Sequence, residues 1–447
     1  MNLFKHLKNN IEQNNLHDYS ALTCHNQSIS YKQLLECIEK YALNFSSENQ
    51  VGIIYLKKSE KFIFSLLALN YSKNIFCPID SETPLNRFIF LTKELDPKWI
   101  ITDQLLTFLD NNYSQINFDG LFIYIKRQAA KKYIKPLTHI YLSSGSTGFP
   151  KIIYLSDEYV IPVIKQQIKI IEISENSNFA WLLSTSFDAS LSDIFVSLFS
   201  GANLHICSFK QTNTKTLNKY FIENKITHSD LSPSILSLLN FHNLHSLKHI
   251  VIGGELANQN TVSHLHNQFQ INFYNAYGPT EATICSSMKK IDANWVNSDI
   301  GLPFDGVDYI IIDGELLING HLFLGYSDND LTSKKIETIN NKIYYHSGDL
   351  VCFKNNSFHY MGRKDRQFKK NGNLICPEEI ENFCKNNGCD IAVLYNINNT
   401  LELKYTGLIE IEYIKHKIME NFPAYMVPQK IFKIDDIKRN INGKIMI

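Results

Sequence analysis

The stretch that most constrains the fold of this chain is a Ser- and Gly-rich loop between two short apolar runs. Residues 137–142 alternate and favour a strand, and residues 152–155 form a second apolar run. Glycines between them let backbone N–H groups turn inward and form an anion nest, and a lysine adds positive charge. The Gly-Lys-Ser/Thr ending of a Walker A loop is missing. A polar hairpin turn is the alternative, but four hydroxyls, two glycines and a lysine in nine residues favour phosphate binding. The predicted phosphate-binding residues are Ser143, Ser144, Gly145, Ser146, Thr147, Gly148 and Lys151.

The rest of the sequence alternates strand-like and helix-like segments. Residues 49–55 and 75–80 are typical of strands, whereas residues 60–71 have helical periodicity. Ser156 is a predicted N-cap for a helix that ends near residue 171. This alternation predicts an α/β fold, and 447 residues are enough for two or three domains.

Charge and cysteine usage restrict the class of partner. The 44 basic residues balance the 44 acidic residues, which argues against a nucleic-acid-binding role. The N-terminus has no signal-peptide core, and no apolar run approaches membrane-spanning length. Nine scattered cysteines without a Cys-x-x-Cys pair suit reduced thiols. We therefore expect a cytoplasmic protein with no nucleic-acid and no membrane partner.

Residues 275–281, Asn-Ala-Tyr-Gly-Pro-Thr-Glu, form a second motif. Tyr277 offers a flat face for adenine, and Asn275 offers an amide for its edge. Thr280 can donate to an α-phosphate, and Glu281 supplies the hard oxygen that Mg²⁺ prefers. Tyr-Gly-Pro-Thr alone would be an ordinary turn. Its order and distance after the first loop favour a nucleotide site.

Three later turns carry further candidates. Asp349 follows a tight Gly turn and can hold two vicinal hydroxyls, such as those of a ribose. Arg363 can reach the ribose or a phosphate. A tight Asn-Gly turn presents Lys444 close to the last residue of the sequence. Taken one at a time, each is also explained as a solvated turn, and Lys444 as a frayed terminal lysine.

Together these motifs resemble the adenylate-forming (AMP-binding) superfamily of acyl-CoA synthetases, luciferases and amino-acid adenylation domains. Within it they look most like the nonribosomal peptide synthetase and D-alanine–carrier-protein ligase type. The resemblance implies a large N-terminal core of layered sheets and helices over residues 1–364. It also implies a small C-terminal α+β lid over residues 365–447, hinged at Asp365. The lid hairpin departs from the family pattern at Leu374 and Cys376, where the family has Arg and Glu.

The resemblance also implies roles for the motif residues. Lys444, Glu281 and Thr280 would be catalytic, and Glu281 would bind Mg²⁺. Lys444 and the metal would neutralise the α-phosphate and the substrate carboxylate. The implied ATP-binding residues are the phosphate-loop residues named above with Gly254, Glu255, Asn275, Ala276, Tyr277, Gly278, Pro279, Thr280, Asp349, Tyr360, Arg363 and Lys444.

Residues 187–190, Phe-Asp-Ala-Ser, look like the motif of the amino-acid-activating members. In that motif the aspartate pairs with the α-ammonium of the substrate, which assigns this role to Asp188. Asp188 could equally cap the helix that follows it, and both roles can hold at once. The implied substrate pocket is lined by Asp188, Ala189, Ser192, Asp230, Val251, Gly253, Ala276, Ile284 and Cys285.

Asp230 is a second acid on an otherwise small and apolar pocket wall. A buried carboxylate needs a partner, and a substrate cation would supply it. This favours lysine, ornithine or arginine as the substrate. The alternatives are that Asp230 contacts backbone near residues 232–233, or that a small substrate such as alanine leaves room for water.

The resemblance therefore implies an ATP- and Mg²⁺-dependent enzyme that forms an aminoacyl-AMP. Because no carrier domain is recognisable in the sequence, we expect the aminoacyl group to pass to the phosphopantetheine thiol of a separate carrier protein. An acyl- or aryl-CoA synthetase is the alternative, and such an enzyme would not need Asp188. A catalytically silent nucleotide-binding homologue is the third possibility, suggested by the short tail and the altered lid hairpin.

Overall fold

The structure, a computed structural model, describes residues 2–128, 130–134, 136–144, 150–208, 213–236 and 238–435. The chain forms two compact units. Unit 1 comprises Met1–Ser81, Asp96–Tyr141 and Ile152–Lys364, and unit 2 comprises Glu82–Leu95, Leu142–Lys151 and Asp365–Ile447. The chain thus changes unit after Lys364, and two earlier stretches also belong to unit 2.

The first sheet of unit 1 carries four of the nine predicted substrate residues, Asp230, Val251, Gly253 and Ala276, on its strands. Its five inner pairings, from β14 to β1, are parallel, and both edge strands run antiparallel. Residues that follow the carboxyl ends of such strands gather at one edge of the sheet. In spatial order the strands are β15 (Ser287–Lys290), β14 (Asn272–Tyr277), β13 (His249–Gly253), β12 (His228–Leu231), β10 (Asn178–Trp181), β11 (Asn203–Ile206), β1 (Ser20–Cys24) and β2 (Gln27–Ser30).

The second sheet contains the strands on both sides of the Ser- and Gly-rich loop. Its central strands are buried along their whole length, which explains their unbroken apolar sequences. In spatial order the strands are β19 (Gly325–Tyr326), β9 (Lys151–Leu155), β8 (His139–Ser143), β4 (Ile75–Ile79), β3 (Val51–Tyr55), β5 (Trp99–Thr102), β7 (Leu121–Lys126) and β6 (Tyr113–Phe118).

The third sheet is antiparallel and holds the Asp349 and Arg363 segments on neighbouring strands. Its register sets Asp349 opposite Arg363. In spatial order the strands are β16 (Asp299–Gly301), β22 (Ser357–Arg363), β21 (Lys342–Lys354), β18 (Glu315–Asn319) and β17 (Asp308–Ile312), with β20 (Ile336–Ile339) paired to β21.

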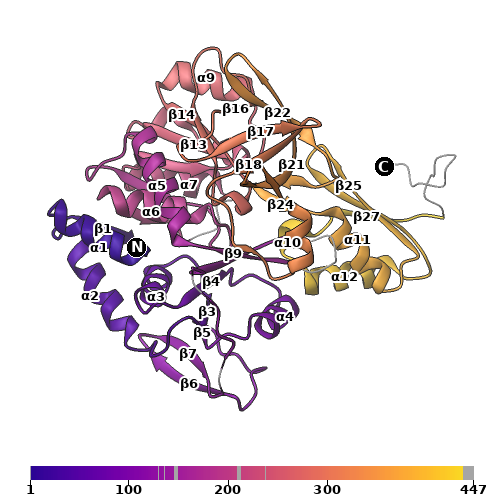
Figure 1. Cartoon of the computed structure of the whole chain (residues 1–447), viewed down its shortest axis with the longest axis horizontal. Helices are drawn as coiled ribbons and strands as arrows, with labels where there is room; N and C mark the ends of the chain where they lie inside the picture. The colour runs from indigo at the N-terminus through magenta and orange to yellow at the C-terminus, as the bar shows by residue number, and fades with distance from the viewer. Residues whose placement is uncertain are drawn as a thin grey trace. The chain divides into compact units, whose positions relative to one another are not determined.

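Helices cover the sheets of unit 1, and α1 contacts both α3 and α6 (Figure 1). The predicted N-cap is confirmed, because the Ser156 side chain accepts from the Glu158 N–H and the helix spans Asp157–Ile171. The helices are α1 (Leu3–Gln13), α2 (Tyr31–Ala42), α3 (Glu60–Tyr71), α5 (Asp157–Ile171), α6 (Ser190–Ser200), α7 (Thr214–Glu223), α8 (Pro233–Leu236), α9 (Gln259–Phe269) and α10 (Asn329–Lys335), with short 3₁₀ turns η1 (Phe241–Asn243) and η2 (Thr280–Ala282).

Unit 2 packs two helices and a three-stranded sheet around its own apolar core. A helix from early in the chain belongs to this unit, and its Arg87 forms an ion pair of 2.9 Å with the fully buried Glu379. The elements are α4 (Leu85–Leu95), β23 (Phe368–Lys370), β24 (Asn373–Ile375), α11 (Pro377–Asn386), β25 (Ile391–Ile397), β26 (Thr400–Thr406), α12 (Ile411–Asn421), η3 (Ala424–Met426) and β27 (Lys430–Lys433). The predicted α/β class is confirmed. Within the described ranges, no helix has the length and apolar composition that a membrane span requires.

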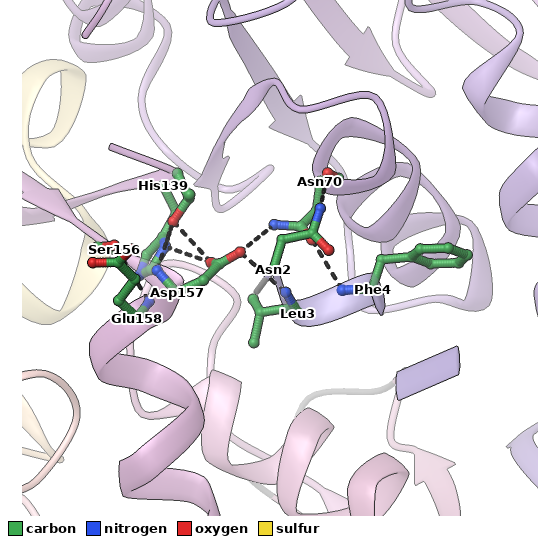
Figure 2. Close-up of polar contacts among 9 residues, drawn as sticks. Asn2, Leu3, Phe4, Asn70, His139, Ser156, Asp157 and Glu158 are labelled. Atoms are coloured by element: carbon green, nitrogen blue, oxygen red, sulfur yellow. Dashed lines mark hydrogen bonds and ion pairs between the residues drawn. The ribbon is translucent and has the colours of Figure 1, made fainter. Parts of the chain in front are cut away.

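A buried carboxylate ties the base of the β8–β9 hairpin to the N-terminal helix. Asp157 Oδ2 accepts hydrogen bonds from the Leu3 N–H at 3.1 Å and from Asn70 Nδ2 at 2.7 Å. Asp157 Oδ1 accepts from the Thr138 hydroxyl at 2.8 Å and lies 3.4 Å from His139 Nδ1. Figure 2 shows this carboxylate between the start of α1 and His139. Burial opposes ionisation, but the hydrogen bonds outweigh it and lower the pKa of Asp157.

Candidate active site

The turn after β14 is built on a close approach of two chain segments. A Cβ on Gly278 would lie 2.5 Å from Cys285 Cα, so no larger residue fits there. Beyond η2, Thr283 and Ile284 adopt φ angles of 55° and 67°. β-branched residues rarely enter this left-handed region. Backbone strain of this kind clusters at functional sites.

The strained turn supplies donors to Asp188. The Thr280 hydroxyl donates to Asp188 Oδ1 at 3.1 Å, and the Ile284 N–H donates to Oδ2 at 3.0 Å. Burial raises the pKa of Asp188 to about 6 against these two donors, and the charge of Glu281 also raises it. The N-cap of α6 is Ala189, which has no side-chain cap. The Asp188 carboxylate contacts both the turn of residues 280–284 and the backbone of Ala189 at the start of α6.

The structure brings three predicted nucleotide residues together around Asp349. The Tyr277 phenol donates to Asp349 Oδ2, and Arg363 donates to Oδ1 at 2.8 Å. Arg363 also donates to the Ser347 carbonyl at 2.9 Å. These bonds fix a buried carboxylate beside an aromatic ring, which suits recognition of a ribose and its base.

Glu281, the predicted metal ligand, is buried at 6% exposure beside a second tyrosine. The Tyr326 phenol donates to Glu281 Oε1 at 2.6 Å. In the described part of the chain, no other donor contacts this carboxylate. A carboxylate with one oxygen oriented by a neutral donor fits a hard cation such as Mg²⁺ at its other oxygen.

Two predicted adenine contacts have partners within the protein. Asn275 Nδ2 donates to the Asp299 carbonyl at 2.7 Å, so part of the amide expected at the adenine edge is engaged. Glu255 Oε1 accepts from the Ser234 N–H at 3.2 Å, at the start of α8. Gly254 has a φ of 81°, which explains the glycine at this turn.

Among the predicted pocket residues, Ser192 and Cys285 are joined by a residue that the sequence analysis missed. Gln167 Oε1 accepts from the Ser192 hydroxyl at 2.5 Å, and Gln167 Nε2 donates to Cys285 Sγ at 3.2 Å. Gln167 lies on α5 in no recognisable motif. Its only sequence signal is a polar residue inside an apolar helix.

Asp230 lies against another buried acid, Asp193. Asp193 Oδ2 accepts from the Leu182 and Leu183 N–H groups, each at 3.1 Å. Burial raises the pKa of Asp230 to about 7, and burial followed by the charge of Asp230 raises that of Asp193 well above its usual value. Lys58 nearby donates to the Leu182 carbonyl at 2.6 Å. The two carboxyl groups can share a proton, a solution that the sequence analysis did not consider.

The remaining predicted pocket residues lie on adjacent strands. Gly253 at the end of β13 is in register with Ala276 of β14, and a Cβ on Gly253 would lie 2.9 Å from the Ala276 carbonyl oxygen. Val251 is buried on the same strand. The backbones of β13 and β14 therefore lie close together at this wall of the predicted pocket, and small side chains line it.

The phosphate loop is described only at its ends. The Ser144 hydroxyl donates to the Leu374 carbonyl at 2.6 Å within unit 2. Ser143 and Lys151 are half-buried. Two further predicted ATP-binding residues lie outside this loop. Pro279 immediately precedes η2, and the Tyr360 N–H donates to the Ser298 carbonyl at 2.7 Å. Gly145, Ser146, Thr147, Gly148 and Lys444 lie outside the described residues.

Comparison with known proteins gives consistent relatives. The sequence matches the family described as AMP-binding enzyme over residues 9–326. Bacitracin synthase 1 of Bacillus licheniformis is 26% identical over 96% of this chain and 9% of the relative. Gramicidin S synthase 1 of Brevibacillus brevis is 24% identical over 95% of this chain and 42% of the relative. The chain therefore spans less than half of these curated relatives.

Solved structures share the fold. The Vibrio cholerae adenylation domain AlmE, in complex with glycyl-adenosine-5'-phosphate, aligns with a TM-score of 0.86 at 19% identity, over 99% of this chain and 95% of that chain. NpsA-ThdA, an artificially fused adenylation–PCP di-domain from Klebsiella oxytoca, gives 0.83 at 20% identity, over 96% and 93%. Their fold has the large N-terminal and small C-terminal parts that the sequence predicts. On its motifs, its fold and its match over residues 9–326, the chain belongs to the AMP-binding enzyme family.

Proposed function

We propose that this protein adenylates an amino acid with ATP and passes the aminoacyl group to the phosphopantetheine thiol of a separate carrier protein. Members of the AMP-binding family use ATP, and the relatives include peptide synthetases. The single observation that carries the amino-acid assignment is the buried Asp188 carboxylate, oriented by Thr280 and Ile284. A buried carboxylate in this position is complementary to an ammonium group.

In the first step, a carboxylate oxygen of the amino acid attacks the α-phosphorus of ATP. A new P–O bond forms, and the bond to the bridging oxygen breaks, so that pyrophosphate leaves with the electron pair. Both reactants are anions, and positioning and charge neutralisation are therefore the main contributions of the protein. We assign the loop of residues 143–151 to the leaving pyrophosphate. We assign Thr280 to the α-phosphate, toward which its hydroxyl would turn from Asp188 when ATP binds, while the Ile284 N–H continues to hold Asp188.

Nucleotide binding follows from the contacts around Asp349. Its carboxylate, fixed by Tyr277 and Arg363, would hold the ribose hydroxyls, while the Tyr277 ring lies against adenine. Glu281 would bind Mg²⁺, which neutralises phosphate charge when present. Lys444 would approach the α-phosphate and the substrate carboxylate from the C-terminal part of the chain.

In the second step, the carrier thiol attacks the acyl carbon of the adenylate. A C–S bond forms, the acyl–phosphate C–O bond breaks, AMP leaves and the thiol proton is released. We propose that residues 365–447 act as a lid that reorients about Asp365 between the two steps. The reason is that adenylation and thiol transfer require different protein groups at the same site.

The substrate side chain is proposed to carry a positive charge. Asp193 and Asp230 are both buried and face each other, and Lys58, whose charge lowers the pKa of Asp193, is one cation beside two carboxyl groups. The second carboxyl group therefore needs either a proton or another cation. A basic amino acid would place its side-chain cation beside Asp230 and its α-ammonium beside Asp188. Alternatively, Asp193 and Asp230 share a proton. A substrate cation beside Asp230 predicts a basic amino acid as the substrate, whereas a shared proton predicts a neutral one.

Pyrophosphate exchange into ATP, measured across amino acids, their deaminated analogues, and fatty and aryl acids, tests the proposal. We expect exchange with an amino acid and none with its deaminated analogue. A preference for an acid without an amino group would identify a CoA synthetase instead. Exchange with no acid, despite AMP binding, would identify a silent homologue.

The catalytic lysine has a matched control in the same part of the chain. Lys444→Ala should reduce exchange by about 100-fold or more, the effect of removing one charge-stabilising group, and should leave ATP affinity nearly intact. Lys415, an exposed lysine on α12, provides the control, because Lys415→Ala removes the same charge at a residue that belongs to no predicted site. Equal exchange by Lys444→Ala and wild type would remove this lysine from the mechanism.

A further inference from the structure

The segment of residues 323–326 holds Glu281 at two points. The Tyr326 phenol donates to Glu281 Oε1 at 2.6 Å, and the Phe323 N–H donates to the Glu281 carbonyl at 2.8 Å. Tyr326 is 2% exposed and Glu281 is 6% exposed, so both groups are shielded from water. One short segment therefore fixes both the backbone and the side chain of Glu281.

Tyr326 is itself held by its backbone and by its ring. Its N–H donates to the Thr332 hydroxyl at 2.9 Å, and its ring packs edge-on against Phe323 with centroids 4.8 Å apart. The ring of Tyr345 also packs edge-on against Phe323, at 5.5 Å. The Tyr326 phenol also shares a hydrogen bond with the Tyr345 phenol, which helps to hold it beside Glu281.

The strand that carries Tyr326 is paired to the strand that leaves the phosphate loop. In β19, Gly325 is in register with Tyr154 and Tyr326 with Ile153 of β9. Further bonds from the Leu324 N–H to Tyr154 and from the Ser327 N–H to Ile152 extend this pairing at both ends. The position of the phenol is thus set by β9.

We propose that Tyr326 is a positioning residue that holds the Glu281 carboxylate in the orientation that binds the divalent cation of the ATP complex. This inference rests on the proposed function through the metal-binding role of Glu281. A phenol suits the task because it orients one oxygen and leaves the full negative charge for the cation. A lysine or arginine at the same place would neutralise the charge that the cation requires.

A phenol that merely completes the packing would make the same contacts, and the variant Tyr326→Phe separates the two roles. It keeps the ring against Phe323 and removes only the hydroxyl. Tyr344→Phe is the matched control, because the Tyr344 phenol donates to the Asp308 carboxylate at 2.7 Å on the third sheet. Both variants lose one phenol–carboxylate bond, and only one of those bonds reaches Glu281.

The measurement is nucleotide affinity by calorimetry, with saturating Mn²⁺ and with EDTA, on the full chain. For Tyr326→Phe we expect an affinity for the metal–nucleotide complex that is about 10- to 100-fold weaker, the usual effect of losing a bond to a metal ligand. Affinity in EDTA should match wild type, and Tyr344→Phe should match wild type in both conditions. Thermal unfolding of each variant checks that the fold is retained.

If Mn²⁺ raises the nucleotide affinity of Tyr326→Phe as much as it raises that of wild type, the inference is wrong. A loss of equal size with Mn²⁺ and with EDTA would overturn it as well, since that pattern indicates a packing role. If wild type binds the Mn²⁺ nucleotide and Tyr326→Phe does not, while no acid supports pyrophosphate exchange, the inference stands and the proposed reaction fails.

Discussion

The Ile284 N–H donates to Asp188 Oδ2 over 3.0 Å while Ile284 itself holds a φ of 67°. Residues in this region cost on the order of 1–3 kcal/mol each, and Thr283 beside it adds a second. The fold tolerates this strain at the point where a backbone donor meets a buried acid.

Substrate affinity should depend on pH through Asp188. Its pKa is raised to about 6, mainly by burial, so that protonation below this pH removes the charge that would pair with an ammonium. The KM for the amino acid should rise by about tenfold per pH unit below 6, while the KM for ATP changes little. Pyrophosphate exchange between pH 5 and 8 measures both constants.

The contribution of Asp188 to the free energy of unfolding should change with pH in the opposite direction to substrate affinity. A folded pKa above the unfolded value means that ionisation of Asp188 opposes folding, and its contribution falls as pH rises from about 4 to 6.

Asp188→Asn should abolish the pH dependence of the KM and weaken amino-acid binding at neutral pH. A KM that stays flat between pH 5 and 7 in wild type would contradict the assignment.

Removal of the second acid should change which amino acid is preferred. Asp230→Ala should lose its preference for a basic amino acid over a neutral one by about 10- to 100-fold, with an unchanged KM for ATP. Exchange rates across lysine, ornithine, arginine, alanine and leucine give the ranking. If wild type already ranks a neutral amino acid first, the shared proton between Asp193 and Asp230 is the correct description, and the acids are structural.

Addition of one methyl group at Gly278 should disrupt the site. Its Cβ would lie 2.5 Å from Cys285 Cα, and a backbone atom cannot move as a flexible side chain can. Gly278→Ala should reduce the free energy of unfolding by about 1–3 kcal/mol and weaken ATP binding. Gly306→Ala separates the two kinds of cost, because its nearest atom is 3.7 Å away and its φ of 82° leaves only backbone strain, about 1–2 kcal/mol. Equal urea midpoints for Gly278→Ala and wild type would contradict the steric argument.

Replacement of the buried Asp157 should destabilise unit 1. In Asp157→Asn an amide NH₂ group replaces one of the two acceptor oxygens. Depending on which oxygen is replaced, this NH₂ group faces Leu3 and Asn70, or it faces Thr138 and His139. We expect a loss of about 3 kcal/mol in unfolding free energy. Because the folded pKa is lowered, this stabilisation is present above about pH 4 and disappears as pH falls. The difference from wild type should therefore shrink in acid.

Asp308→Asn provides the control for this experiment. The pKa of Asp308 is also lowered, by bonds from Tyr344 and Lys342, but its side chain is 43% exposed. Its loss should cost less than about 1 kcal/mol. Urea unfolding at pH 7 compares the two variants, and equal losses would show that burial at Asp157 adds nothing.

Local patterns predicted the elements well because they depend on neighbouring residues. Hydrophobic periodicity and the Ser156 cap placed α5, and the Tyr-Gly-Pro-Thr motif placed a turn that follows β14. Contacts between distant segments could not be predicted in this way. Gln167 is 118 residues from Cys285, and no local pattern marks it as a partner.

Two side chains show why residue type alone does not fix a role. The predicted role of Asn275 at adenine stays a prediction, and its amide nitrogen also donates to a carbonyl of β16. Asp230 likewise keeps its predicted role beside a substrate cation, and Asp193 next to it offers a shared proton as the other solution. Both neighbours come from distant parts of the sequence, and such neighbours become visible only in three dimensions.

The two-residue strand β19 also limits how this chain can change in length. Side chains alternate along a strand with a period of two, so one inserted or deleted residue turns the following side chain to the opposite face. Between Phe323 and Tyr326 such a change would direct the phenol away from Glu281, although every residue type were preserved. Relatives of this protein should therefore vary in loop length elsewhere and keep a constant spacing across these four positions.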